Sequence, residues 1–377
     1  MLLLKSFLYL TTFLTCVLAL PSRSHSRHHV PSQYLSARGV DPISCSKGRK
    51  APSPACCVWY EVLDHLQEDL FSGGQCLEEA HEVSLTFHDA IGYSQSLTLQ
   101  GEWGGGGADG SIMHHLDVEG LFPPNEGMDN IVEAQRSIAL RYHVSYADMI
   151  QFAGAVGASN CRGAPRLEFL AGRPNSSFPS PEGLLPDVAG SAESILARMA
   201  DAGFTPNDLV DLLASHSIAA QDDIDKSIPG SPFDSTPYDF DARFFAETLL
   251  EGNTWPGDGP HDGEEQSPLA GEFRLHSDYV IARHPETACR WQSFITDQNA
   301  MMDRFKEAMS KLAIVGQNRN SLYDCSPIIP IPAPPLAQVV TLPAGKTNED
   351  IQAACSATPF PTLSSDPGAY ISGWRFC

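Results

Sequence analysis

Basic residues are scarce in this sequence. The 377 residues include 24 lysines and arginines against 46 aspartates and glutamates, which gives a net charge of −22. Such an acidic chain does not suit nucleic acid or an anionic membrane surface as a partner, and it favours cation binding. An aromatic content of 9%, with 30 glycines and 29 prolines, excludes a coiled coil and a collagen, while 42% hydrophobic residues are typical of a globular chain.

Long hydrophobic runs are absent beyond the first 20 residues. Lys5 precedes a largely apolar run over residues 6–20, which is shorter than the ~20 residues that a bilayer-spanning helix needs. We therefore predict a signal peptide over residues 1–20 and a pro-segment over the His- and Arg-rich residues 21–38, with secretion of the mature protein. The alternative is an N-terminal membrane anchor.

Cysteines at zinc-finger spacing are also missing, so a metal framework is not expected. Removal of residues 1–38 leaves nine cysteines, which should pair in an exported protein with one left over. Asn175-Ser176-Ser177 is a glycosylation sequon.

Strand-like alternation is scarce, and the apolar spacing predicts helices instead. A Pro-rich tail follows Cys325, and we expect it to wrap the body of the protein. The predicted helices cover residues 58–71, 78–91, 146–156, 192–202, 205–215 and 285–312.

Two histidines interrupt apolar helical segments. His88 follows Leu85-Thr86-Phe87, and His216 follows Leu212-Leu213-Ala214-Ser215. Each could be an ordinary core histidine with a satisfied hydrogen bond. Together they suggest a prosthetic group held between two helices, such as haem with one iron ligand and one acid–base partner.

Oxygen-rich segments occur twice, in Gly107–Ser111 close to Asp89 and in Phe233–Asp241. Calcium prefers six to eight oxygen ligands from carboxylates, hydroxyls and backbone carbonyls. Each segment could bind such an ion, although solvated turns have the same composition.

Taken together, these sequence segments resemble the secreted fungal class II haem peroxidases, most closely the manganese and versatile peroxidases. The resemblance implies an all-α haem peroxidase fold with a distal half over residues 39–187, a proximal half over 188–325 and a Pro-rich wrapping tail over 326–377. The motifs that carry it are Leu85–Ile91, Gly105–Ser111, Gln151–Ala155, Ala164–Glu168, Gly172–Asn175, Leu213–Ser217, Pro232–Pro237 and Asp278.

The resemblance implies roles around a haem b cofactor. His216 would bind the iron and Asp278 would accept the other ring proton of His216. His88 would be the distal acid–base catalyst. Asn125 would hold the other ring nitrogen of His88, and Glu119 would complete this hydrogen-bond chain. Phe87 and Phe233 would flank the haem on its two sides.

The family also implies two calcium ions and four disulfides. The distal calcium would be bound by Asp89, Gly107, Asp109 and Ser111, and the proximal calcium by Ser217, Asp234, Thr236, Asp239 and Asp241. The implied disulfides are Cys45–Cys57, Cys56–Cys325, Cys76–Cys161 and Cys289–Cys355, which leaves Cys377 odd.

Three acids match the family's manganese carboxylates by motif position. Glu78 and Glu82 are four residues apart, hence on one face of a helix, and Asp222 lies six residues after His216. Carboxylates suit a hard divalent ion, although a Glu pair at this spacing is more often an exposed helix face. Versatile and lignin peroxidases carry a surface tryptophan five residues before the proximal histidine, where this sequence has Asp211.

One position departs from the family pattern. The family has an arginine four residues before the distal histidine, where it stabilises the leaving hydroxide, but here Ser84 occupies that position. The segment from Glu82 to His88 is also one residue shorter, which turns a helix by about 100°. Either this is a crippled or altered peroxidase that activates peroxide slowly, or the recorded sequence has lost one residue and altered another at a splice junction.

The sequence therefore predicts a monomeric, hydrogen-peroxide-dependent enzyme that oxidises Mn(II) to Mn(III) and acts on lignin-type phenols. Its expected partners are hydrogen peroxide, Mn(II) and small phenols or organic-acid chelators. The alternatives are a generic phenol-oxidising peroxidase and a peroxidase-fold protein disabled by Ser84.

Overall fold

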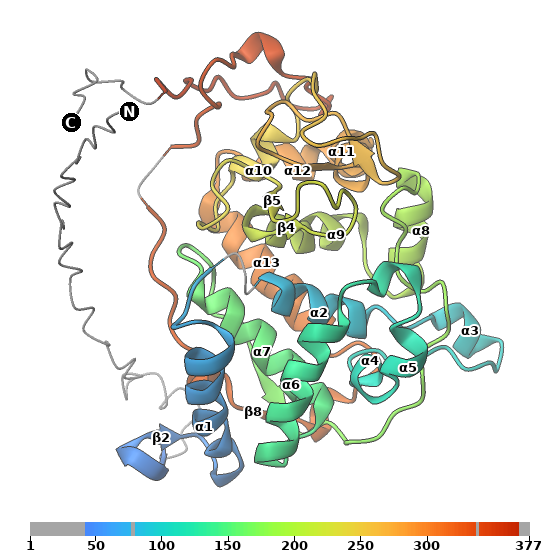
Figure 1. The fold of residues 1–377 in the computed structure, drawn as a ribbon, viewed down its shortest axis with the longest axis vertical. Helices are drawn as coiled ribbons and strands as arrows, with labels where there is room; N and C mark the ends of the chain where they lie inside the picture. The colour runs from blue at the N-terminus through green and yellow to red at the C-terminus, as the bar shows by residue number, and fades with distance from the viewer. Residues whose placement is uncertain (1–41, 77–79, 337–338, 369–377) are drawn as a thin grey trace, which may run out of the picture.

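The protein is described by a computed structural model that covers residues 42–76, 80–336 and 339–368 (Figure 1). The expected signal peptide and pro-segment lie outside these residues. Helices dominate, which confirms the predicted all-α class, and every strand in the described chain has two residues. Among the described helices, none is both long and apolar enough to cross a membrane.

One group of helices lies in the lower part of Figure 1. It comprises α1 (Val58–His65) with its π-helical continuation (Leu66–Leu70), α3 (Gln95–Leu99), α4 (Ser111–His114), α5 (Leu116–Glu119), α6 (Asp129–Tyr142) and α7 (Tyr146–Asn160).

A second group lies in the upper part of Figure 1, and two helices lie between the groups. The upper group comprises α8 (Ala192–Asp201), α9 (Pro206–Leu212), the 3-10 helix η6 (Leu213–Ile218), α10 (Arg243–Glu247), α11 (His276–Arg283) and α12 (Ala288–Phe294). The helices between them are α2 (Ala80–Ala90) and α13 (Gln298–Leu312). Both contact η6, and α2 also packs on α7.

The strands of the described residues form four antiparallel pairs, which close loops rather than build a sheet. The pairs are β1 (Ile43–Ser44) with β2 (Lys50–Ala51), β3 (Leu170–Ala171) with β8 (Tyr323–Asp324), β4 (Ala220–Gln221) with β5 (Ser231–Pro232) and β6 (Glu264–Glu265) with β7 (Arg274–Leu275).

Helix α7 is the central support of α2. Every residue from 147 to 159 is buried, and the run is rich in alanine and glycine, so neighbouring helices can approach its backbone closely. The Ser145 side chain accepts a hydrogen bond from the Asp148 backbone N–H at 3.2 Å and caps the first turn. This packing places the C-terminal end of α2 in the middle of the molecule.

The prediction of one uninterrupted helix over residues 285–312 is wrong. The structure divides it into α12 and α13, because the Asp297 carboxylate accepts a hydrogen bond from the Ala300 backbone N–H at 2.9 Å and starts a new helix. Helix α6 was missed, since Gln135 is buried in its core-facing stripe and breaks the apolar periodicity.

The four expected disulfides are present, as Cys45–Cys57, Cys56–Cys325, Cys76–Cys161 and Cys289–Cys355. Cys56–Cys325 joins residues 269 positions apart and ties the segment before α1 to the start of the Pro-rich tail. That tail then touches both helix groups. Gly163 donates its backbone N–H to the Ala333 carbonyl, and Gln292 donates its side-chain amide to the Thr358 carbonyl.

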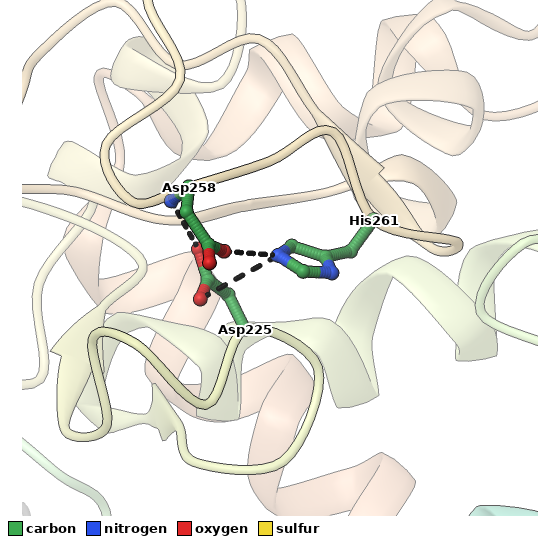
Figure 2. A group of neighbouring side chains, drawn as sticks. All are labelled: Asp225, Asp258 and His261. Atoms are coloured by element: carbon green, nitrogen blue, oxygen red, sulfur yellow. Dashed lines mark hydrogen bonds and ion pairs between the residues drawn. The ribbon is translucent and has the colours of Figure 1, made fainter.

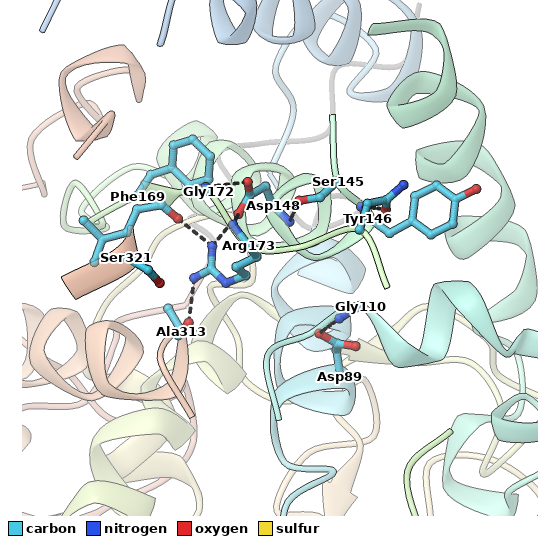
Figure 3. A network of polar contacts seen from close by, with 12 residues as sticks. Asp89, Gly110, Ser145, Tyr146, Asp148, Phe169, Gly172, Arg173, Ala313 and Ser321 are labelled. Atoms are coloured by element: carbon cyan, nitrogen blue, oxygen red, sulfur yellow. Dashed lines mark hydrogen bonds and ion pairs between the residues drawn. The ribbon is translucent and has the colours of Figure 1, made fainter. Parts of the chain in front are cut away.

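A buried ion pair fastens the loop after β3 to α7 and to the end of α13 (Figure 3). The Arg173 guanidinium is fully buried and lies 2.8 Å from the Asp148 carboxylate, and it also donates to the carbonyls of Leu170 and Ala313. Asp148 accepts further hydrogen bonds from the backbone N–H groups of Gly172 and Arg173.

Replacing Asp148 by Ala is expected to lower the free energy of unfolding by about 3–5 kcal/mol, because a buried arginine loses its counter-charge. The matched control is Glu307→Ala, which removes one partner of the exposed pair Arg304–Glu307 and should leave the denaturant midpoint nearly unchanged. Equal shifts of the two midpoints in denaturant unfolding would contradict the assignment.

Candidate functional site

His88 lies in the last turn of α2 and is oriented by Asn125. Its Nδ1 is 2.8 Å from the Asn125 Oδ1 atom. The Asn125 amide nitrogen donates to the backbone carbonyl of Glu119 at 2.8 Å, so the Oδ1 atom must be the acceptor for His88. His88 therefore carries its proton on Nδ1 and keeps a lone pair on Nε2. Burial of the ring lowers its pKa, because burial disfavours the charged imidazolium.

Glu119 contributes to this chain through its backbone rather than through its side chain. The Glu119 carboxylate instead accepts hydrogen bonds from the Ser180 backbone N–H at 3.0 Å and from the Ser180 hydroxyl at 2.6 Å. Sequence reasoning missed Ser180, since nothing in its local pattern distinguishes it from a loop serine. The contact fixes the segment that positions Asn125.

Ser84 lies one turn before His88 in α2, hence on the same face of the helix, and it is half-buried. Phe87 packs beside His88 with ring centroids 6.2 Å apart. Glu78 and the Glu82 side chain lie outside the described part of the chain.

His216 lies in η6 and its Nδ1 is 2.9 Å from the Asp278 Oδ2 atom. Asp278 lies in the first turn of α11 and is buried. The carboxylate accepts the Nδ1 proton, so the Nε2 lone pair of His216 is available to a metal. The rings of Phe233 and Phe244 lie 5.2 and 5.7 Å from the His216 ring, and sequence reasoning missed Phe244.

The two histidines thus belong to elements that contact each other, α2 and η6. Both present an Nε2 lone pair, and both have Nδ1 engaged with an acceptor of fixed orientation. A neutral imidazole with this second hydrogen bond suits His216 as an axial ligand of haem iron, and the same lone pair lets His88 accept a proton. The residues therefore fit a haem between α2 and η6.

The first oxygen-rich loop brings Asp89, Asp109 and Ser111 together in the interior. Asp89 accepts a hydrogen bond from the Gly110 backbone N–H at 3.0 Å (Figure 3), while its Oδ1 atom and the Ser111 hydroxyl are buried without a hydrogen-bond partner. Burial raises the pKa of Asp89, and it raises that of Asp109 to about 6. Gly107 passes close to the Val315 carbonyl, where a side chain would not fit. Unsatisfied buried oxygens of this kind fit a calcium ion.

The second loop gathers its oxygens in the same way. Asp234 is fully buried, and one carboxylate oxygen accepts the Thr236 backbone N–H while the other has no partner. The Thr236 hydroxyl donates to Asp241 at 3.1 Å, and Ser217 directly follows His216. Burial and the nearby Glu247 raise the pKa of Asp234. Asp239 differs from the others because it also pairs with Arg162 at 3.4 Å.

Calcium removal is expected to make stability fall as pH rises. Without the ion, the pKa of Asp109 is raised from its ordinary value of 3.8 to about 6, so the folded state binds more protons than the unfolded state between these values. The contribution of Asp109 to the free energy of unfolding is then fully present below about pH 4. This contribution, about 3 kcal/mol, is lost as pH rises through 6. Thermal unfolding of calcium-free and calcium-loaded protein at several pH values measures the difference. A parallel pH dependence in both forms would contradict it.

Asp222 lies just after β4, and its carboxylate accepts the Gly230 backbone N–H at 2.7 Å. This contact orients the carboxylate across the β4–β5 turn.

Asp211, at the position of the family's surface tryptophan, is buried and forms a two-point ion pair with Arg290 at 2.7 and 2.8 Å. Asn175, the sequon asparagine, is exposed and accepts the Tyr146 backbone N–H.

Comparison with known proteins agrees with this geometry. The peroxidase family model matches residues 62–297, and the fungal peroxidase extension region matches residues 300–377. A versatile peroxidase from Pleurotus eryngii is 50% identical over 329 residues, which covers 86% of this chain and 89% of the relative. Manganese peroxidase 3 from Phlebia radiata is 49% identical, covering 88% and 92%. A peroxidase from Arthromyces ramosus is 46% identical, covering 88% and 91%.

Proposed function

Because this chain belongs to the peroxidase family and carries the fungal extension region, it is an oxidoreductase, and we propose that it is a secreted enzyme that uses hydrogen peroxide to oxidise Mn(II) and acts on lignin-type phenols. The family implies haem and hydrogen peroxide. The observation that carries the proposal is the matched pair of oriented imidazoles, His88 with Asn125 and His216 with Asp278, on contacting elements.

The proximal residues would hold the haem iron. Asp278 keeps His216 in the tautomer whose Nε2 lone pair can bind a metal, and the negative carboxylate makes that imidazole a stronger donor. Phe233 and Phe244 restrict the ring of His216 from its sides. Bound haem would supply an iron centre that peroxide oxidises by two electrons and that two one-electron donors then restore.

The distal residues would move the proton. His88 Nε2 accepts a proton from one peroxide oxygen and returns it to the other as the O–O bond breaks. The Asn125 amide keeps the His88 proton on Nδ1 during this transfer, and the Glu119 carbonyl keeps the amide in that orientation. Burial lowers the pKa of His88, so the ring stays a base in moderately acidic solution.

The manganese part of the proposal rests on Asp222, with Glu78 and Glu82 as the other carboxylates. The Asp222 carboxylate is held by the Gly230 N–H, and Asp222 follows His216 by six residues in the chain. One relative of this chain is named a manganese peroxidase. The acidic chain would attract the cation, and chelated Mn(III) would diffuse to the phenols.

Replacing Asp222 by Ala is expected to abolish Mn(II) oxidation and to leave oxidation of a small phenol within about twofold, because the carboxylate would serve only the cation. The matched control, Asp223→Ala, removes the neighbouring exposed carboxylate and should preserve both activities. Steady-state rates with Mn(II) and with a phenol measure the split. Equal loss of both activities in Asp222→Ala would contradict a manganese-specific role.

A second candidate function is a phenol-oxidising peroxidase without manganese use. The one-residue shortening between Glu82 and His88 favours it, since it would rotate Glu82 relative to His88 in a regular helix. A relative named only as a peroxidase is 46% identical. Undiminished phenol oxidation with no manganese turnover in the unmodified protein would support this candidate. Stopped-flow mixing with peroxide, followed at the haem band, tests the activity that both candidates share.

A further inference from the structure

A histidine and two aspartates converge outside the proposed haem, calcium and manganese sites. Asp225 comes from the β4–β5 turn, whereas Asp258 and His261 come from the loop before β6 (Figure 2). His261 Nε2 lies 2.8 Å from the Asp258 Oδ1 atom and 3.5 Å from the Asp225 Oδ1 atom. One ligand atom from each residue lies within 4.8 Å of the other two. We call these three residues the Asp225 cluster.

Asp225 is fully buried and held in one position. Its carboxylate accepts hydrogen bonds from the Ser227 backbone N–H at 2.8 Å, the Ser227 hydroxyl at 2.6 Å and the Asp258 backbone N–H at 3.2 Å. The loop approaches so closely at Gly257 that a Cβ atom there would lie 1.8 Å from the Asp225 Oδ2 atom. Both Ser227 donors reach Oδ1 and the Asp258 N–H reaches Oδ2, so the one open lone-pair position of the carboxylate is on Oδ2.

Glu264 provides an independent observation beside the cluster. It is 6% exposed, and its Oε1 atom is buried without a hydrogen-bond partner. Its Oε2 atom accepts the His261 backbone N–H at 3.0 Å, which places this carboxylate inside the same loop. Three carboxylates and one imidazole are thus concentrated here, which is an excess of negative charge.

We propose that Asp225, Asp258 and His261 bind one divalent transition-metal cation of the zinc type, with the Glu264 carboxylate beside it. The ligand atoms of a tetrahedral zinc ion, about 2.0–2.1 Å from the metal, lie about 3.3 Å apart. The two distances from His261 Nε2, 2.8 and 3.5 Å, bracket that separation. An imidazole nitrogen favours zinc over calcium, which takes oxygen ligands.

The proposed ion would join two loops. Asp225 lies three residues after Asp222, in the turn that positions the proposed manganese carboxylate. A cation between Asp225 and the 257–264 loop would restrain that turn. The cluster's own ligands do not include Asp222, so the site differs from the manganese site and does not depend on the proposed function.

Zinc binding to the full-length, calcium-saturated, manganese-free protein tests the proposal. We expect isothermal titration with Zn(II) alone to give one site per chain that the His261→Asn substitution weakens about tenfold or more, with Asp258→Asn acting in the same direction. Co(II) should give visible ligand-field bands in the unmodified protein that disappear in His261→Asn. Zinc should also raise the thermal unfolding midpoint of the unmodified protein but not that of His261→Asn.

The matched control is His276→Asn, because His276 lies 3.3 Å from a single carboxylate, Glu265, and should not contribute to the zinc site. Asp222→Ala should likewise leave the zinc affinity unchanged, which separates this site from manganese binding. The proposal is overturned if zinc does not bind, if His261→Asn binds it as tightly as the unmodified protein, or if His276→Asn weakens it equally. Loss of stability in His261→Asn without any zinc effect in the unmodified protein would show a simple ion pair instead.

Discussion

Replacing Ser84 by Arg is expected to accelerate the reaction of the haem-loaded protein with hydrogen peroxide by about 100-fold or more. Ser84 lies four residues before His88 in α2, so an arginine here would extend from the helix face that carries the distal base. A fixed positive charge stabilises the hydroxide that leaves as the O–O bond breaks, and one such group contributes about 100- to 1,000-fold. The measurement is the second-order rate constant for the change in the haem band on mixing with peroxide.

Ser84→Gln is the control for this prediction, since it adds a long polar side chain without the charge. It should accelerate the reaction much less than Ser84→Arg. An arginine effect no larger than that of glutamine would mean that the shortened segment turns position 84 away from the peroxide site. A slow unmodified protein that Ser84→Arg rescues would identify this chain as an altered peroxidase whose remaining machinery is intact.

Replacing His88 by Leu is expected to slow the same reaction by about 100- to 10,000-fold, because the proton transfer loses its base. The control is His65→Leu, which removes a histidine of α1 that contacts Tyr142 of α6 and Asp69, and it should leave the rate unchanged. Comparable rates for His88→Leu and the unmodified protein would exclude His88 as the acid–base residue.

The pH dependence gives His88 a second signature. Burial lowers the pKa of His88 below its ordinary value of 6.5, so the ring remains unprotonated and able to accept a proton at mildly acidic pH. The peroxide rate should therefore stay constant as pH falls through 6.5 and decline only at lower pH. His88→Leu should remove this decline. A rate that already halves at pH 6.5 would contradict the assigned environment of the ring.

The helices were largely predictable, because their signal is local. Apolar residues at helical spacing mark α1, α2, α7 and α8, and the structure has helices there. The prediction failed where a local pattern was ambiguous. The Asp297 cap divides α12 from α13. The buried Gln135 interrupts the apolar spacing of α6, so this helix was not predicted.

The site was predictable only in part, and mainly through the order of the family's motifs. His88 and His216 lie on apolar helices, which by itself fits core histidines as well as haem. Their partners Asn125 and Asp278 are 37 and 62 residues away, so no sequence period links them. The backbone role of Glu119 and the Ser180 contact depend on how two loops meet.

The all-helical class, the acidic character and the cysteines available for pairing can be read from the sequence, because composition and short-range spacing act within a few residues. Tertiary structure alone decided which nitrogen of each histidine is engaged, which buried oxygens lack partners and that Asp225 meets His261. Those properties depend on distances between residues that are far apart in the chain, and only the packing of helices and loops sets such distances.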